Sequence, residues 1–345
     1  MKEHSTDTAG AFCPLPLNAN LRRRYAIKNV ISAGACSVTY DAFDYIARQN
    51  VVVKEYFPRQ LALRAEGSDA VSPRNKDCGA LYFLGSEAFM RQYGALTQAI
   101  GNANIVSVFE AFFENGTAYA VMEKLYGVTL ASYLAMHRRP LRLGELARIA
   151  PALGDALLIV HSLSILHHSI CMDSVYLCLD GTVKLFSFGA ARQTLRARHE
   201  LSEDEPWRDV QALGRTLYEA CTGKAPEDGG TAKSAELPAA LSGMLTRMTT
   251  DDPAQRFASV FDFRHAVVSL DLEPEPFDLT QERIMAYSVE QAELAQRERR
   301  LQAAHNRKRE RERVRLARRG RLLALLGAAL LLIIVLAAIF AGQCR

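Results

Sequence analysis

Residues able to do chemistry gather in one histidine-rich loop and one strand-like run. His167, His168 and Ser169 are consecutive, and Asp173 follows Ser169 by four residues. A serine hydroxyl attacks only when a base activates it, and a histidine adjacent in sequence rarely faces it. The loop therefore does not predict a nucleophile with its base. Lys54 is the cation of the run VVVKEY. It could serve an anionic ligand or form a purely structural ion pair, and the sequence leaves both open.

The cysteines and the overall composition exclude several classes of protein. The seven cysteines are scattered, odd in number and without a C-x-x-C pair, which argues against a disulfide framework or a zinc site and fits a reducing cytoplasm. We predict no metal site. With 345 residues, 49% of them hydrophobic and 23% charged, the chain has material for one large two-lobed domain or two smaller ones. The net charge of +4 is uneven, because residues 297–321 hold 12 Arg or Lys and only 3 Glu.

Hydrophobic periodicity predicts a β-rich part followed by a mostly helical part. Strands are predicted at Tyr25–Val30, Ser37–Phe43, Val51–Tyr56, Ile105–Phe113 and Ala118–Glu123, with a turn at Asn115-Gly116 between the last two. Helices are predicted at Ser86–Ile100, Leu141–Leu163 and Val210–Thr222, and Gly223 is placed to end the last of them. The pattern indicates a small β-lobe followed by a larger α-lobe.

Seven motifs appear in a fixed order along these elements. They are ISAGACSVTY (31–40), VVVKEYFP (51–58), NIVSVFEAFFENGTAYAVMEKLYG (104–127), LHHSICMDSVYL (166–177), KLFSFGAAR (184–192), DVQALGRTLYEACTG (209–223) and DPAQRF (252–257). Together they resemble the bacterial Ser/Thr protein kinases of the eukaryotic-like (Hanks) type, from about residue 24 to residue 270. The resemblance implies an α+β, bilobal protein-kinase-like fold, with a small β-rich N-lobe and a larger α-helical C-lobe.

The resemblance also indicates which residues would bind a nucleotide. By their positions in the motifs they are Gly34, Val38, Val52, Lys54, Met122, Glu123 and Leu125. Only the middle glycine of the family's G-x-G-x-x-G loop is kept. The loop therefore allows positive φ angles and a close approach of its backbone to a phosphate less readily. Val52 stands where the family has alanine, and together with Tyr176 it could fill the adenine site. We expect that no cofactor is required and that any ATP binding does without strong Mg²⁺ coordination.

The residues that would carry out phosphoryl transfer are replaced. That reaction needs a general base, two metal ligands and an acid that holds the lysine. These positions hold Ser169, Ser174 with Ser187, and Gln92, so no catalytic site is intact. A serine provides neither a base near neutral pH nor the anionic oxygen that Mg²⁺ prefers, and a glutamine supplies no charge. Glu87, about a turn before Gln92, could substitute for the acid.

Residues that pack in the family are kept. His167 and Phe188 stand at positions that join the family's hydrophobic spine, and Asp209 stands where an aspartate braces the catalytic-loop backbone. Arg256 is also kept, but the acid that would pair with it belongs to an A-P-E motif that this sequence lacks. Glu203–Glu205 form an acidic patch whose role the sequence does not indicate.

The C-terminal segment predicts a membrane anchor. Leu322–Gly342 contains 21 residues without a charge, and about 20 apolar residues in a helix cross the hydrocarbon core. Basic residues crowd Arg307–Arg321 before the span and only Arg345 follows it, so we expect a single-pass protein of the inner membrane with its N-terminal domain in the cytoplasm. The same basic run is expected to contact anionic lipid headgroups, and no nucleic acid.

These features predict five segments. They are a disordered leader (1–20), a protein-kinase-like domain (21–275, with the N-lobe at about 21–123 and the C-lobe at about 124–275), a charged and basic juxtamembrane helix (276–321), a transmembrane helix (322–342) and an extracytoplasmic tail (343–345). Ile284, Tyr287, Leu294 and Leu301 give the juxtamembrane helix a thin apolar stripe, through which it could form a homodimer.

The simultaneous loss of the base, both metal ligands and the acid favours a pseudokinase. We expect a membrane-tethered scaffold or regulatory module that binds protein partners at the membrane. Two alternatives stay open. A protein kinase or other nucleotide transferase could use rearranged carboxylates such as Asp173 or Asp180. A metal-independent sensor could bind ATP through Gly34, Lys54 and the hinge.

Overall fold

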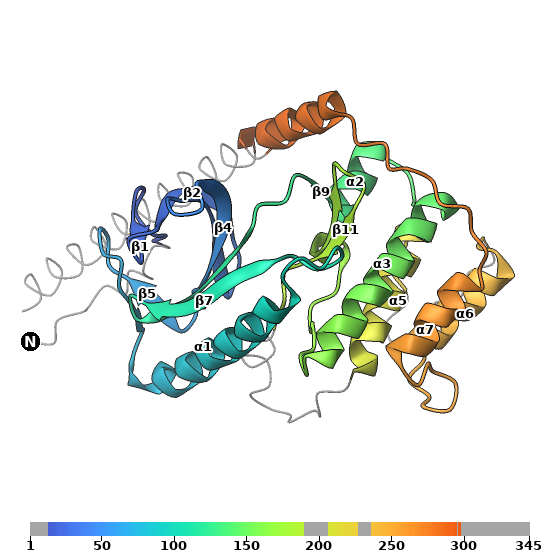
Figure 1. Cartoon of the computed structure of the whole chain (residues 1–345), viewed down its shortest axis with the longest axis horizontal. Coiled ribbons are helices and arrows are strands. Elements are labelled where there is room, and N and C mark those ends of the chain that lie inside the picture. The colour runs from blue at the N-terminus through green and yellow to red at the C-terminus, as the bar shows by residue number, and fades with distance from the viewer. Residues whose placement is uncertain (1–12, 190–205, 227–235, 295, 298–345) are drawn as a thin grey trace, which may run out of the picture. The chain divides into compact units, whose positions relative to one another are not determined.

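The computed structural model describes residues 13–189, 206–226, 236–294 and 296–297 (Figure 1). The chain forms two compact units, Met1–Leu279 and Thr280–Arg345. Residues 281–294 of the second unit are helical. Among the described residues, no helix combines the length and the hydropathy needed to cross a membrane. The predicted span 322–342, the tail 343–345 and the basic run Arg307–Arg321 lie outside the described residues.

The first unit begins with a six-stranded antiparallel sheet in the order β1-β2-β3-β4-β8-β7 (Figure 1). Its strands are β1 (Asn20–Leu21), β2 (Tyr25–Ala33), β3 (Ser37–Asp44), β4 (Gln49–Tyr56), β7 (Val108–Glu114) and β8 (Thr117–Glu123), and a separate hairpin is formed by β5 (Ala62–Arg64) and β6 (Val71–Pro73). Every second residue of β3 is buried, as expected for a strand with one face on a core. The five predicted strands of this lobe are confirmed, although β7 begins at Val108 and not at the predicted Ile105.

The hairpin between β7 and β8 turns at Asn115-Gly116, as predicted. Both residues have positive φ, 52° and 76°, which is the type I′ geometry that matches the twist of paired strands. A Cβ on Gly116 would also collide with the carbonyl oxygen of Val71. Glycine is therefore required here both by the backbone conformation and by the neighbouring strand.

Residues 13–20 pack on the sheet, so the prediction of a disordered leader over 1–20 is wrong for this part. Leu15 is 3% exposed, and its amide donates to the Tyr40 hydroxyl at 3.0 Å. The Cys13 carbonyl accepts a hydrogen bond from the Arg64 guanidinium at 3.2 Å. Burial of a leucine and pairing of two backbone groups explain why the segment is held against the lobe. Residues 1–12 lie outside the described part.

A buried ion pair lies under this N-terminal segment. The side chains of Glu55 and Arg64 are fully buried and hydrogen-bonded to each other. Glu55 also accepts from the hydroxyls of Tyr40 at 2.7 Å and Tyr119 at 2.8 Å. A carboxylate removed from water is tolerated only when its oxygens are satisfied in this way. Because side chains alternate along a strand, the neighbouring Lys54 points to the opposite side of β4.

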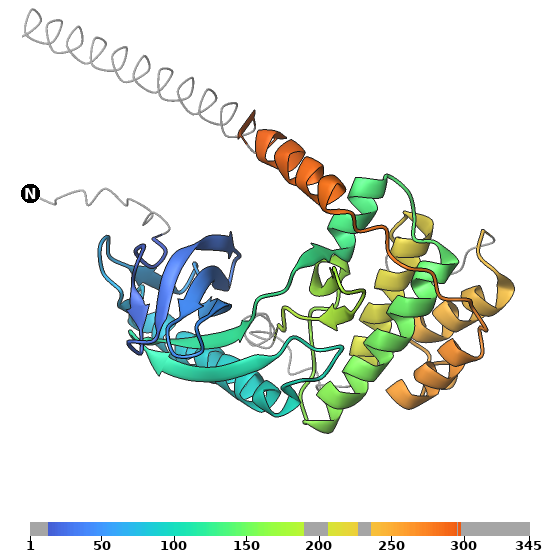
Figure 2. The same cartoon turned by 45° about the horizontal axis from the view of Figure 1, so that its top comes forward.

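Helix α1 (Lys76–Leu96) begins ten residues before the predicted start at Ser86. Its N-terminus is capped by the Asn75 side chain, which accepts from the Cys78 amide at 2.9 Å. The first half carries two glycines and exposed residues, so its apolar period is weak in the sequence. One of these, Gly85, lies so close to the Tyr56 ring that a larger residue would displace it. Figure 2 shows α1 running beside the sheet, and it contacts β7 and β8.

The second half of this unit is helical, with one small sheet. Its elements are α2 (Leu130–His137), α3 (Leu143–Ser162), α5 (Trp207–Thr222), α6 (Ala239–Thr249), α7 (Val260–Val268), the short 3₁₀ turns η1 (Thr97–Ala99) and η2 (Met172–Ser174), and the strands β9 (Gly127–Thr129), β10 (Val175–Cys178) and β11 (Val183–Leu185) in the order β11-β10-β9. The predicted helices at α3 and α5 are confirmed. Gly223 ends α5 with a φ of 70°, as its position predicted.

The segment before Thr280 is a strap on the C-lobe, which corrects the predicted boundary at 275/276. The Asp278 amide donates to the Tyr133 hydroxyl at 3.2 Å, and Phe277 packs edge-on against the Tyr133 ring. The Glu275 amide donates to the Gly144 carbonyl at 2.9 Å. Residues 276–279 therefore belong to the first unit, and Asp278 is hydrogen-bonded to the side chain of Tyr133 in α2.

The buried ion pair gives a test of the fold. Arg64→Met would leave the Glu55 carboxylate buried without its cation, and we expect the free energy of unfolding to fall by about 3–5 kcal/mol. Urea unfolding of the full chain in detergent, followed by circular dichroism, measures this loss. Lys76→Met, at the exposed start of α1, is the matched control and should change stability by less than about 0.5 kcal/mol. An equal loss of unfolding free energy in the two variants would show that the Glu55–Arg64 ion pair does not stabilise the fold.

Candidate functional site

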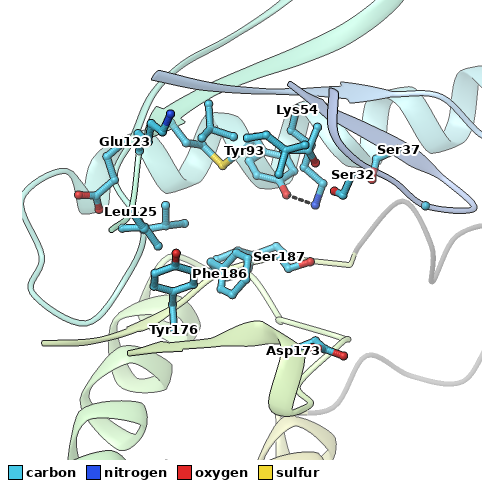
Figure 3. A pocket seen from close by; sticks show the side chains of 18 of the residues that line it. Ser32, Ser37, Lys54, Tyr93, Glu123, Leu125, Asp173, Tyr176, Phe186 and Ser187 are labelled. Atoms are coloured by element: carbon cyan, nitrogen blue, oxygen red, sulfur yellow. Dashed lines mark hydrogen bonds between the residues drawn. The ribbon is translucent and has the colours of Figure 1, made fainter. Parts of the chain in front are cut away.

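A cavity of about 910 Å³ lies between the sheet and the β10–β11 region (Figure 3). Its walls come from the glycine-poor loop between β2 and β3, from β4, from the hinge after β8, and from the turn after β11. The size is in the range of small-molecule sites. Figure 3 shows Lys54, Ser32 and Ser187 at one end, and Leu125 and Tyr176 at the other. The cavity thus has Lys54 and serine hydroxyls at one end, and aliphatic and aromatic side chains beside Glu123 at the other.

The residues predicted to bind a nucleotide gather around this cavity. Those that line it are Gly34, Val52, Lys54, Met122, Glu123 and Leu125. Val38 is completely buried in β3 and is not among the lining residues. Val52 and Tyr176 contribute to the walls, and the space between the walls remains. The concern that these two side chains fill the slot is therefore not supported.

Lys54 is held by a residue that the sequence did not single out. Its ammonium donates to the Tyr93 hydroxyl at 2.7 Å and lies 5.3 Å from the centre of the Tyr93 ring. Lys54 is 9% exposed, and Tyr93 is 1% exposed. Burial raises the pKa of Tyr93, so the hydroxyl stays neutral and holds the lysine without an opposite charge. The only signal in the sequence was an aromatic residue next to the expected acid position.

Gln92, at the position where the family has the acid, is hydrogen-bonded to the chain before the catalytic loop. Its Nε2 donates to the Leu166 carbonyl at 2.9 Å, and the side chain is 2% exposed. This bond ties α1 to the loop that leads into His167. Glu87, the alternative acid, is exposed and does not line the cavity. The helix that carries an acid in the family therefore contacts the site through neutral groups.

The catalytic-loop backbone is braced by Asp209, as the resemblance implied. Its carboxylate accepts from the amides of His167 at 2.7 Å and His168 at 3.0 Å, and from the His161 ring at 3.0 Å. Burial alone would raise the pKa of Asp209, but these hydrogen bonds outweigh it and lower the pKa. The carboxylate is therefore ionised at neutral pH and fixes the loop. His168 adopts a positive φ of 58° in this arrangement.

His167 has a packing role. Its ring lies 4.5 Å from the Phe188 ring, and its Nε2 is 2.9 Å from the Phe186 carbonyl oxygen. Complete burial lowers the pKa of His167 to about 4, so the ring is neutral at pH 7 and does not act as a cation. The predicted contact between the histidine and the phenylalanine is confirmed.

Ser174, at one metal-ligand position, is bonded into its own loop. Its hydroxyl donates to the Cys171 carbonyl at 2.8 Å and accepts from the Cys171 amide at 2.9 Å. The side chain is 1% exposed and does not line the cavity. A hydroxyl has one proton to donate, and here that proton serves the turn. Ser174 therefore closes the 3₁₀ turn η2 of the catalytic loop.

The other two serines differ in their access to the cavity. Ser169, at the general-base position, lies under the next turn, because a Cβ on Gly189 would come within 2.7 Å of the Ser169 Cβ. Ser169 does not line the cavity. Ser187 does line it and has a φ of 64°, a left-handed conformation that costs a non-glycine residue about 1–2 kcal/mol. The turn at Ser187 thus has a left-handed residue at the position where the family carries its metal-binding aspartate, and that residue is a serine.

The carboxylates proposed for a rearranged mechanism are placed apart. Asp173 is exposed and lines the cavity. Asp180 lies in the turn between β10 and β11, where it accepts from the amide and the hydroxyl of Thr182 at 2.9 and 2.7 Å. It does not line the cavity. Within the described part of the chain, no group of three His, Cys, Asp or Glu residues is placed to hold a metal ion.

Arg256, whose acid partner is missing, stacks on an aromatic ring. Its guanidinium lies 4.2 Å from the centre of the Trp207 ring, at the start of α5. A cation over an indole face is attracted by the ring electrons and remains well packed. The structure thus identifies Trp207 as a partner of Arg256. The acidic patch Glu203–Glu205 lies outside the described residues.

Comparison with known proteins agrees with this geometry. A family model described as protein tyrosine and serine/threonine kinase matches residues 84–211. The chain is 24% identical over 275 residues to a probable serine/threonine-protein kinase of Clostridium acetobutylicum, an alignment that covers 69% of this chain and 38% of that protein. It is 25% identical over 277 residues to the serine/threonine-protein kinase PrkC of Bacillus subtilis, covering 69% of this chain and 39% of PrkC. The chain therefore spans about two-fifths of the length of these relatives.

A solved structure shares the fold. PpkA-294 in its apo form superposes with a TM-score of 0.64 at 23% sequence identity, covering 74% of this chain and 99% of that one. At this identity the likeness concerns the fold alone. It supports the two-lobed arrangement in which the cavity lies.

The bond between Gln92 and the catalytic loop can be tested by hydrogen exchange. Gln92→Leu removes the donor to the Leu166 carbonyl, and we expect the amides of His167 and His168 to exchange about tenfold faster, as for the loss of one hydrogen bond. Native-state exchange followed by mass spectrometry measures this. Glu87→Gln, on the exposed face of α1, should leave these amides unchanged. Unaltered exchange in Gln92→Leu would show that α1 does not support the loop.

Proposed function

The chain belongs to the Hanks-type protein kinase family, and from that premise we propose that its kinase-like domain is a pseudokinase. We infer that it acts as a membrane-tethered scaffold or regulatory module that binds a partner protein. Its activity as an enzyme is then absent or severely impaired, because phosphoryl transfer depends on positioned charges that these positions lack.

The observation that carries this proposal is the local bonding of Ser174. Its hydroxyl donates to and accepts from Cys171 within one turn, so it is used to close the loop. The Ser174 hydroxyl is already hydrogen-bonded within its own loop. This supports a loop that provides a stable surface better than a loop that binds Mg²⁺. The second ligand position, Ser187, offers a neutral hydroxyl to the cavity.

The packing residues support the same proposal. Asp209 braces the loop, and His167 packs on Phe188, although none of the three contacts a reacting group in this account. A binding module needs a fixed shape, and these contacts provide it. Its partner is expected at the membrane, because the predicted span 322–342 would keep the domain there.

A metal-independent nucleotide sensor is the second candidate function. The open cavity of about 910 Å³ favours it, since a scaffold alone does not require such a space. Lys54 and the serines beside it would face the anionic part of a ligand. The nucleotide would then act as a signal that changes the affinity for the partner protein.

Phosphoryl transfer provides the first test of this proposal. We expect the full chain in detergent, supplied with labelled ATP and Mg²⁺ or Mn²⁺, to incorporate no more phosphate into itself or into a general protein substrate than Lys54→Met does. The reason is that losing even one catalytic group usually costs orders of magnitude in rate. Incorporation that disappears in both Lys54→Met and Asp173→Asn would instead establish a rearranged enzyme.

The membrane anchor provides the second test. Deletion of residues 322–345 should move the protein from the membrane fraction to the soluble fraction of bacterial cells, because it removes the 21 uncharged residues. High-salt and alkaline washes distinguish a spanning helix, which stays, from a peripheral contact through Arg307–Arg321, which is released. Extraction of the full chain by alkaline carbonate would argue against the anchor.

A further inference from the structure

Two hairpin turns lie side by side at one end of the N-lobe sheet. One joins β1 to β2 and comprises residues 22–24, and the other joins β3 to β4 and comprises residues 45–48. The two are linked directly, because the Tyr45 amide donates to the Arg24 carbonyl at 3.0 Å. They therefore form one continuous surface, which we call the turn surface.

The turn between β3 and β4 carries exposed apolar side chains. Ile46 is 73% exposed, more than any other large hydrophobic side chain in the described part of the chain. Its neighbour Tyr45 is 57% exposed. Apolar side chains exposed side by side mark a surface that contacts another molecule or a membrane.

Hydrogen bonds to Asp44 fix the conformation of this turn. The Asp44 carboxylate accepts from the amides of Ile46 at 2.9 Å and Ala47 at 3.0 Å. It also accepts from the Arg24 guanidinium at 2.9 and 2.7 Å. The hydrogen bonds from Arg24 lower the pKa of Asp44, so the carboxylate is ionised at neutral pH. A turn that is already ordered loses little conformational entropy when it binds to a surface.

Two arginines flank the apolar side chains of the turn surface. Arg23 and Arg48 are both exposed, and each has a positive φ, 53° and 54°. Three carboxylates at this end of the sheet, Asp44, Glu110 and Glu114, each accept a hydrogen bond from another arginine of the β1–β2 turn. Within the described part of the chain, Arg23 and Arg48 form no such pair. Their guanidinium groups are therefore available to an anionic partner.

We propose that the turn surface docks the kinase-like domain on an anionic lipid bilayer. Ile46 and Tyr45 would enter the interface between headgroups and acyl chains, and Arg23 and Arg48 would contact lipid phosphates. Apolar side chains between two cations are complementary to a bilayer surface, where phosphates lie above the acyl chains. The inference rests on the proposed membrane tether. It adds a second contact, because a tether at 322–342 alone does not fix which face of the domain meets the membrane.

Tryptophan quenching in lipid nanodiscs tests this contact. The chain has one tryptophan, Trp207, so Ile46→Trp adds a reporter in the turn and the wild type gives the background. The full chain is placed in discs of phosphatidylcholine, or of phosphatidylcholine with phosphatidylglycerol, whose acyl chains are brominated. We expect the added emission to be quenched about twofold more in the anionic discs than in the neutral ones. Phe83→Trp, at a side chain of similar exposure (59%) on α1, is the matched control and should be quenched no more than the wild type.

Charge variants of the Ile46→Trp chain locate the effect. Arg23→Gln and Arg48→Gln should each lower the ratio of docked to free domain about fivefold, as expected for one cation beside an anionic surface. Lys76→Gln removes the same charge at the exposed start of α1 and should leave the quenching unchanged. All three side chains are exposed, and circular dichroism confirms that the variants fold. Because the reporter lies in the turn, lipid contacts of Arg307–Arg321 do not contribute to the signal.

Two outcomes in the discs would overturn the inference. Quenching of Ile46→Trp no greater than that of Phe83→Trp would exclude the lipid contact and favour a protein partner for the turn surface. Equal quenching in neutral and anionic discs would show that the arginines do not select the lipid.

Failure of the tether gives a different result, because the full chain would then not enter the discs at all. Flotation of the same chain with phosphatidylcholine–phosphatidylglycerol vesicles tests the turn surface in that case. We expect Ile46→Ser to reduce the floated fraction, and flotation that this substitution leaves unchanged would overturn the inference.

Discussion

The buried carboxylate of Asp209 holds the loop on which the lower wall of the cavity is built. It accepts hydrogen bonds from the His161 ring and from two loop amides. Displacing the loop would leave an ionised group buried and short of donors, which costs more than a single hydrogen bond. The His167 ring is thereby fixed against Phe188 and the Phe186 carbonyl. These contacts thus fix the shape of the lower wall of the cavity.

Helix α1, in the other lobe, also supports the cavity. The α1 residues that do so, Tyr93 and Gln92, are uncharged. Tyr93 holds Lys54, and Gln92 holds the Leu166 carbonyl. Phe89 packs on Tyr93 with ring centres 4.4 Å apart, so the hydroxyl is carried by a packed aromatic group. Neither of these two hydrogen bonds depends on the ionisation of a carboxylate. Tyr93 and Gln92 thus join α1 to the lysine of β4 and to the catalytic loop.

Sequence reasoning identified the elements whose signals are local. The type I′ turn at Asn115-Gly116 and the helix end at Gly223 follow from backbone conformations that few residues adopt. The ordered motifs located the cavity walls. Their spacing also placed Asp209 and the His167–Phe188 contact correctly, because these two roles depend on the fold.

Other features depend on contacts between distant parts of the chain and could not be predicted in this way. The N-terminal segment is held because Leu15 meets Tyr40 across 25 residues. The strap before Thr280 depends on Asp278 reaching Tyr133, 145 residues earlier in the sequence. Tyr93 was missed because the family places the partner of the lysine one residue earlier, and a helix points successive residues in different directions.

The central claim is that the cavity has lost its metal site, and binding of Mn²⁺ measures this most directly. Free Mn²⁺ is followed by electron paramagnetic resonance while the full chain is titrated in the presence of ATP. The account predicts the same loss of free Mn²⁺ signal as with ATP alone, since Ser174 is bonded to Cys171 and Ser187 is neutral. An additional loss of signal that Asp173→Asn abolishes would contradict the account, because it would show a carboxylate holding the metal in the cavity.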